Sequence, residues 1–138
     1  MPTTVQILVY RGEPVDSINY RHAALFFKFP NGSQSLMNAE GTPGLFEFKA
    51  REDYAPEFSI KLAATIPVAE FSDAVNPWSI RPVVSATPIK NGDLGWNCQN
   101  WVADALGRLV DFGYLTTAQR EPAYRQMIRV IMEAPDNS

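Results

Sequence analysis

The 138-residue chain has one cysteine, Cys98, and one histidine, His22, a pair of residue types that can act together as nucleophile and base. Cys98 follows Asn97, a residue type that often caps a helix, so its thiol is expected in a helical first turn. Backbone N–H groups and the helix dipole favour an anion there, and we expect a thiol pKa below about 8.5. A lone cysteine is more often a small buried hydrophobe, but polar amides surround this one. Cys98 is therefore the candidate nucleophile.

His22 is the candidate general base, because no other side chain in the chain titrates near neutral pH. It opens an apolar run, where a lone histidine is more often a partly buried structural residue. A base of this kind is usually oriented by a third group. A two-residue turn at Asn31-Gly32 would pair residues whose numbers sum to about 63. His22 would then lie opposite Gly41, three positions after Asn38. Asn38 is therefore the candidate orienting residue.

Tyrosine, amide and tryptophan side chains are further candidates for binding a substrate. Tyr20 lies two residues before His22, on the same face of the predicted strand, and could hydrogen-bond a carbonyl group, although packing is the commoner role. Asn97 and Gln99 could donate to an oxyanion, although capping is the simpler account of Asn97. An apolar pocket could be lined by Trp78, Trp96 and Trp101. Trp101 is expected in the core because of its helical spacing.

Four segments in the first half of the chain have the alternation of apolar and polar residues that is typical of strands. Asn-Gly between the second and third segments is the strongest short-range signal for a hairpin. A glycine- and proline-containing turn, 41–44, separates the third from the fourth. The predicted strands are 3–10, 21–29, 33–39 and 44–49. They should form an antiparallel sheet.

The last third of the chain is expected to be helical. Apolar residues recur at steps of three and four from 98 to about 112, and Gly113 follows where a C′ glycine belongs. A second helix should begin at Thr116 or Thr117, with Pro122 in its first turn and residues 134–138 as a frayed tail. Prolines interrupt residues 50–94, where only a strand within 59–65 and a short helix within 68–74 are indicated. The fold class is α+β, with the sheet packed on a central helix that starts at Cys98.

Composition excludes several classes of function. With 12 Lys and Arg against 15 Asp and Glu, the net charge of −3 offers no basic surface to a nucleic acid. One cysteine and one histidine are too few for a Cys/His metal cage, and no metal or other cofactor is expected. No run of about 20 apolar residues and no signal peptide are visible, so we expect a cytoplasmic protein that is not inserted in a membrane. Residues 1–138 should form a single domain. The oligomeric state stays open.

The segments RHAALFF, with His22, and GWNCQNWVADAL, with Cys98, resemble the circularly permuted branch of the papain-like superfamily. That branch includes lecithin:retinol acyltransferase-like proteins and PPPDE isopeptidases, and it stands next to the unpermuted NlpC-type peptidases. The resemblance implies an NlpC-like fold in which His22, Asn38 and Cys98 form the catalytic site. The acyltransferase relatives typically have a second histidine where this chain has Asn38. The NCQNW segment is also similar to one in a group of small fungal proteins.

Two functional hypotheses follow. The first is a thiol-dependent hydrolase or acyltransferase that acts on a small amide, ester, thioester or peptide through Cys98, His22 and Asn38. The second is a small-molecule-binding or accessory protein on the same scaffold, including an isomerase or cyclase that uses acid–base chemistry alone. Burial of Cys98, or a His22 ring far from the sulfur, would favour the second hypothesis.

Overall fold

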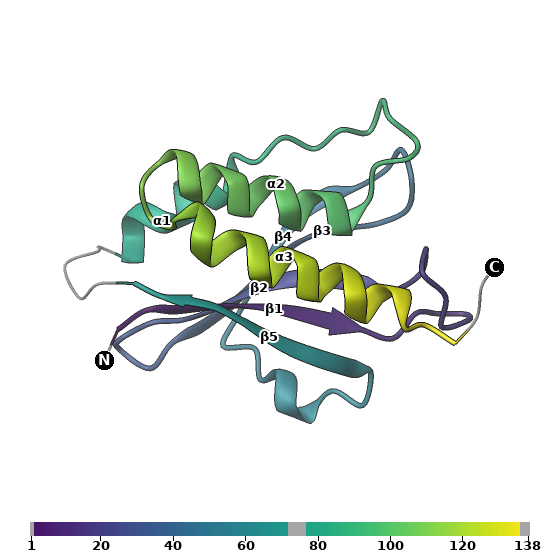
Figure 1. The fold of residues 1–138 in the computed structure, drawn as a ribbon, viewed down its shortest axis with the longest axis horizontal. Helices are drawn as coiled ribbons and strands as arrows, with labels where there is room; N and C mark the ends of the chain where they lie inside the picture. Colours follow the sequence, from purple (N-terminus) through teal and green to yellow (C-terminus); the bar gives the residue numbers. More distant parts are fainter. Residues whose placement is uncertain (1, 72–76, 136–138) are drawn as a thin grey trace.

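The computed structural model describes residues 2–71 and 77–135, which form a five-stranded antiparallel sheet covered on one face by helices (Figure 1). The order of the strands across the sheet is β4-β3-β2-β1-β5. The strands are β1 (Thr4–Tyr10), β2 (His22–Lys28), β3 (Gln34–Glu40), β4 (Glu47–Glu52) and β5 (Leu62–Glu70). The helices are η1 (Pro56–Phe58), α1 (Pro77–Ser85), α2 (Cys98–Asp111) and α3 (Thr117–Met132). The α+β class predicted from the sequence is confirmed.

The two faces of the sheet have separate cores. The helical face packs against α2 and α3, with α2 over β2 and β3 and α3 over β1 and β5. The opposite face, called the outer face below, is partly covered by the connection between β4 and β5 (Figure 1). Ala23, Leu25 and Phe27 of β2 enter the main core and Ala24 and Phe26 the outer core, as expected from strand alternation. The largest buried residues of the main core are Trp101, Phe27, Ile7, Leu25, Met37, Ile66, Ile80, Leu106, Leu109 and Met127.

The predicted hairpin between β2 and β3 is present, with one residue more in its loop than a two-residue turn has. Phe29 N–H donates to the Ser33 carbonyl at 2.9 Å, which closes a loop of residues 30–32. Gly32 has a φ of +87°, the left-handed conformation that three-residue hairpin loops favour. The paired residues, starting at Lys28↔Gln34, therefore sum to 62 instead of the predicted 63. A shift of one residue exchanges the two faces of a strand, so it decides where each side chain of β3 points.

Helix α2 begins and ends as its sequence predicts. The Asn97 side chain accepts from the backbone N–H groups of Gln99, at 3.0 Å, and Asn100, at 3.4 Å. The Asn100 side chain accepts in return from the Asn97 N–H, which completes a capping box. At the other end Gly113 adopts a φ of +84° as the C′ residue. The cap fixes where the first turn of α2 starts, and Cys98 is the first residue of that turn.

The proline-rich middle of the chain differs most from the expectation. Helix α1 was not predicted, because Pro77, Pro82 and Pro88 looked like breaks; Pro77 is in fact its first residue, where a missing N–H costs little. The predicted helix at 68–74 is wrong for residues 68–70, which belong to β5, and residues 72–74 lie outside the described part of the chain. Strands β4 and β5 both start three residues later than predicted.

The C-terminal helix also departs from its prediction. It starts at Thr117 with Thr116 as its N-cap, as expected, but Pro122 lies in its second turn. Ala134 is buried and its N–H donates to the Ile131 carbonyl at 3.2 Å, so the chain is still ordered where a frayed tail was expected to begin. Residues 136–138 of that predicted tail lie outside the described residues. Over the part of the chain described, no helix is both long and apolar enough to cross a bilayer.

Candidate functional site

Cys98 lies where the start of α2 meets the start of β2. Its side chain is buried, with 8% of the residue exposed, and its Sγ lies 4.0 Å from the Arg21 carbonyl oxygen. Burial raises the pKa of the Cys98 thiol, while the backbone N–H groups of Ala23, Gln99 and Cys98 itself lower it to a smaller extent. The expectation of a thiol pKa below its usual value is therefore wrong for this structure. The donors expected at a helix start are present, but desolvation outweighs them.

His22 is the first residue of β2, and its ring lies toward the outer face. The centroids of the His22 and Tyr10 rings are 6.1 Å apart, and Tyr10 belongs to the outer core. Burial is the largest cause that lowers the pKa of the His22 imidazole, with a smaller raising effect from Glu40 and a lowering effect from Arg51. The imidazole is therefore neutral at neutral pH, which is the form a general base needs.

Cys98 and His22, 76 positions apart in the sequence, line one cavity of about 1000 Å³, called the Cys98 cavity below. The thiol contacts the Arg21 carbonyl and makes no hydrogen bond with His22. The structure thus brings the candidate nucleophile and base to one cavity without joining them. The other walls include Tyr20, Asn97, Phe46 and Leu94.

Asn38 lies on the same face of the sheet as the His22 ring. When the β2–β3 register is continued, Asn38 is level with Ala24 and His22 with Glu40. His22 and Asn38 line a second cavity, of about 390 Å³, called the outer cavity below. Asn38 is 1% exposed and its side-chain oxygen has no hydrogen-bond partner. The oxygen of Asn38 therefore does not accept the His22 N–H. The neighbour that the sequence did not reveal is Glu40, which the extra loop residue brings level with His22.

Asn97 and Gln99 both have structural partners at the start of α2. The side-chain oxygen of Asn97 is used for the cap, although the residue also lines the Cys98 cavity. The side-chain N–H₂ of Gln99 donates to the carbonyls of Ile18, at 2.9 Å, and Arg21, at 3.0 Å. Gln99 therefore fastens the β1–β2 connection to the helix, and its amide is not free to bind an oxyanion.

The two aromatic candidates differ from each other. Tyr20 is 52% exposed and lines the Cys98 cavity, but it lies in the turn before β2 and not on the strand. Trp96 does not line that cavity; it is 4% exposed and packs edge-to-face on Phe46, with ring centroids 5.7 Å apart. Its indole N–H donates to the Asp104 carboxylate at 3.3 Å. Of the two, only Tyr20 is placed to contact a molecule in the Cys98 cavity.

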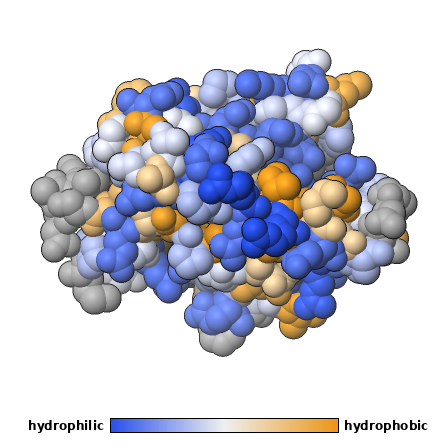
Figure 2. Space-filling view, in the orientation of Figure 1, coloured by the Kyte–Doolittle hydropathy of each residue, from blue (hydrophilic) through white to orange (hydrophobic). Residues whose placement is uncertain are grey.

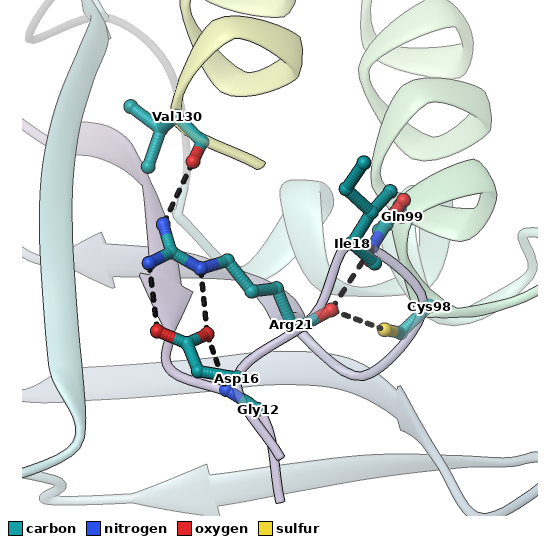
Figure 3. A network of polar contacts seen from close by, with 7 residues as sticks. All are labelled: Gly12, Asp16, Ile18, Arg21, Cys98, Gln99 and Val130. Carbon is teal, nitrogen blue, oxygen red and sulfur yellow. Dashed lines mark hydrogen bonds and ion pairs between the residues drawn. The ribbon is translucent and has the colours of Figure 1, made fainter. Parts of the chain in front are cut away.

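A buried arginine that the sequence analysis did not single out holds the backbone against Cys98 (Figure 3). The Arg21 guanidinium donates to both carboxylate oxygens of Asp16, at 2.8 and 2.9 Å, and to the Val130 carbonyl near the end of α3 at 2.7 Å. The Arg21 carbonyl in turn accepts from Gln99. The hydrogen bond from Arg21 lowers the pKa of the Asp16 carboxyl to about 2. One residue thus ties together the β1–β2 connection, α2 and α3.

The surface around these helices is mainly hydrophilic, with hydrophobic side chains in small separate groups (Figure 2). Within residues 2–71 and 77–135, no group of three or more His, Cys, Asp or Glu is arranged to hold a metal ion. Comparison with known proteins gives no relative: no family model, no curated protein and no solved structure matches the chain.

Proposed function

We propose that the protein is a thiol-dependent hydrolase or acyltransferase in which Cys98 is the nucleophile and His22 the base. The observation that carries this proposal is that both residues, which are the only cysteine and the only histidine of the chain, line one cavity at the start of a helix. Helix α2 begins at the cysteine and packs on β2, the strand that begins at the histidine, and this supports the permuted papain-like arrangement that the sequence resembles.

The surroundings of the sulfur support this chemistry. Three backbone N–H groups, those of Ala23, Cys98 and Gln99, favour the thiolate. They remain available when the proton leaves, because backbone groups in a packed strand and helix need no rearrangement. Burial keeps the thiol protonated at rest, so a base has to take the proton as the reaction starts. His22 is neutral and able to accept it.

The reaction would take place in two steps. The His22 side chain turns from the outer face into the Cys98 cavity and takes the thiol proton while Sγ forms a bond to the acyl carbon. The bond from that carbon to the leaving group breaks, and the imidazolium returns the proton to the leaving group. Water, an alcohol or an amine then gives a proton to His22 and attacks the thioester, which releases the acyl product and restores the thiol. An N–H of the first turn of α2, such as that of Cys98, holds the oxyanion in both steps.

Acetylation by p-nitrophenyl acetate tests the assignment of the nucleophile. Intact-mass measurement followed by peptide mapping should place one acetyl group on Cys98 at neutral pH. In His22→Ala the rate of acetylation should fall by about 100-fold or more, the usual contribution of a general base. Cys98→Ala is the matched control and should acquire no acetyl group at this position. Label confined to lysines, or equal rates in the wild type and His22→Ala, would contradict the proposal.

A second function is favoured by the burial and raised pKa of Cys98. In this alternative the Cys98 cavity binds a small molecule without covalent chemistry, and the cysteine only packs against β2. The same experiment separates the two functions, because a binding protein leaves the Cys98 thiol unmodified.

A further inference from the structure

The outer cavity has the features of a second ligand site, distinct from the Cys98 cavity. It lies on the outer face of the sheet between β1, the start of β2, β3 and the connection after β4. We propose that it binds a small, neutral, planar aromatic molecule that carries one O–H or N–H donor, such as a phenol or an indole. The juxtaposition behind this proposal is a buried, unpaired acceptor on Asn38 beside the rings of Tyr10, His22 and Tyr54.

The unpaired acceptor indicates a donor on the ligand. The side-chain oxygen of Asn38 has no hydrogen-bond partner although 99% of the residue is buried. A buried polar atom without a partner is costly, and native proteins retain few of them without a functional reason. A ligand whose O–H or N–H donates to this oxygen would remove that cost.

Aromatic residues on the cavity walls indicate a flat apolar body for the same ligand. The rings of Tyr10 and His22 are 6.1 Å apart, and the ring of Tyr54 packs edge-on against the outer core. The Tyr10 hydroxyl donates to the Tyr54 hydroxyl at 2.8 Å, which leaves the Tyr54 hydroxyl hydrogen to donate elsewhere. The volume of about 390 Å³ is within the range of small-molecule pockets.

The charges of the cavity indicate that the ligand is neutral. Five charged side chains line it, and four of them form two ion pairs, Arg51 with Glu40 and Lys61 with Glu13. The fifth, Arg11, donates to the Ile60 carbonyl at 2.8 Å. A charged ligand would have to compete with one of these ion pairs or with the Arg11 hydrogen bond, whereas a neutral donor such as a phenol would not.

This site goes beyond the proposed function, because it does not involve Cys98. His22 lines both cavities, so its imidazole reports on the outer one directly. Because it is the only histidine of the chain, its ring gives a single set of imidazole signals in a ¹H–¹³C correlation spectrum.

Titration of the folded protein with phenol and with indole, followed through the His22 ring signals, tests the proposal. We expect a saturable shift in the wild type and in Cys98→Ser, the control that alters only the other cavity. In Asn38→Leu, which keeps the branched shape and the number of heavy atoms and removes the acceptor, the dissociation constant should rise about tenfold or more, as for the loss of one hydrogen bond to a buried group. Toluene, which has no donor, should bind the wild type more weakly than phenol does.

A second variant keeps the test decisive if Asn38→Leu does not fold. Tyr54→Phe removes the hydroxyl that can donate to the ligand and should weaken phenol binding several-fold. The proposal is overturned if neither probe shifts the His22 signals up to its solubility limit, or if toluene and phenol bind alike. It is also overturned if the shift disappears in Cys98→Ser, which would place the ligand in the Cys98 cavity. A failed acetylation of Cys98 would leave these results unaffected, so the two proposals fail separately.

Discussion

At the scale of single residues, burial sets the chemistry of this protein more than charge does. It raises the pKa of the Cys98 thiol and lowers that of the His22 imidazole, so both side chains are neutral at neutral pH. Such a pair needs a proton transfer at the moment of reaction, unlike a pair that rests as thiolate and imidazolium. The same burial leaves the side-chain oxygen of Asn38 without a partner, which is a cost carried by the folded state.

The cost at Asn38 leads to a prediction about stability. Replacing Asn38 by leucine removes an unpaired buried acceptor and keeps the branched shape and the number of heavy atoms. We expect the free energy of unfolding, measured with urea, to rise by about 1 kcal/mol, the lower end of the penalty for an unsatisfied buried group. Asn38→Ala is the control, because it removes the acceptor but leaves a cavity, and it should gain less. A loss of stability in Asn38→Leu would show that the oxygen has a partner.

At the scale of elements, the site depends on how the β1–β2 connection is held against two helices. The Arg21 side chain donates to Asp16, which lies in the same β1–β2 connection, and to the Val130 carbonyl of α3. The Arg21 backbone carbonyl accepts a hydrogen bond from Gln99 of α2 (Figure 3). The ion pair is mostly buried, with 9% of the Arg21 and 18% of the Asp16 side chain exposed. Removal of one partner would leave the other desolvated without compensation, which is the costly way to break such a pair.

Asp16→Asn should therefore lower the free energy of unfolding by about 2 kcal/mol at neutral pH, part of the cost of breaking a buried pair. The pKa of Asp16 is lowered from 3.8 to about 2 in the folded state, so its stabilising effect is complete above pH 3.8 and is lost as the pH falls toward 2. The difference in stability between the wild type and Asp16→Asn should shrink across this window. A difference in stability that stays constant from pH 5 to about 2 would show that protonation of Asp16 does not weaken its stabilising effect.

The two helix caps allow a matched comparison of stability and chemistry. Asn97 caps α2 beside Cys98, and Thr116 caps α3 with the same type of capping box. Asn97→Ala and Thr116→Ala should each lower the free energy of unfolding by about 1 kcal/mol. Only Asn97→Ala should also slow the acetylation of Cys98, because it loosens the turn that carries the sulfur and its N–H donors. Equal rates of acetylation in the two variants would show that the Asn97 cap does not affect the reactivity of Cys98.

The elements that could be predicted are those whose signals are local. The alternation in β1, the hairpin at Asn31-Gly32 and the cap at Asn97 each arise within a few residues, and all three are present. Helix α1 was missed because Pro77 and Pro82 look like breaks in isolation, and what holds α1 is packing against α2, a contact far away in the sequence. The predicted β2–β3 register differs from the observed one by one residue, because the loop length depends on how Phe29 and Ser33 pair.

At the scale of the whole molecule, two cavities adjoin at the start of the central strand β2, and His22 lines both. The sequence singled out Cys98 by its type and its place after a helix cap, and His22 by its type; the fold brings them to one cavity across 76 positions. It did not indicate that Trp96 packs in the core or that Gln99 is used by the β1–β2 connection. These depend on partners distant in sequence, and so does the contact of Arg21 with α3.

The pH dependence of Cys98 acetylation tests the central claim most directly, that His22 activates a neutral thiol. If His22 is the base, the wild-type rate follows the neutral imidazole, whose pKa lies below 6.5, and is already level at pH 7. In His22→Ala the rate should instead keep rising with the thiolate fraction to above pH 9.0, because burial raises the pKa of the thiol. A wild-type profile that rises through pH 9.0 like that of His22→Ala would contradict the account.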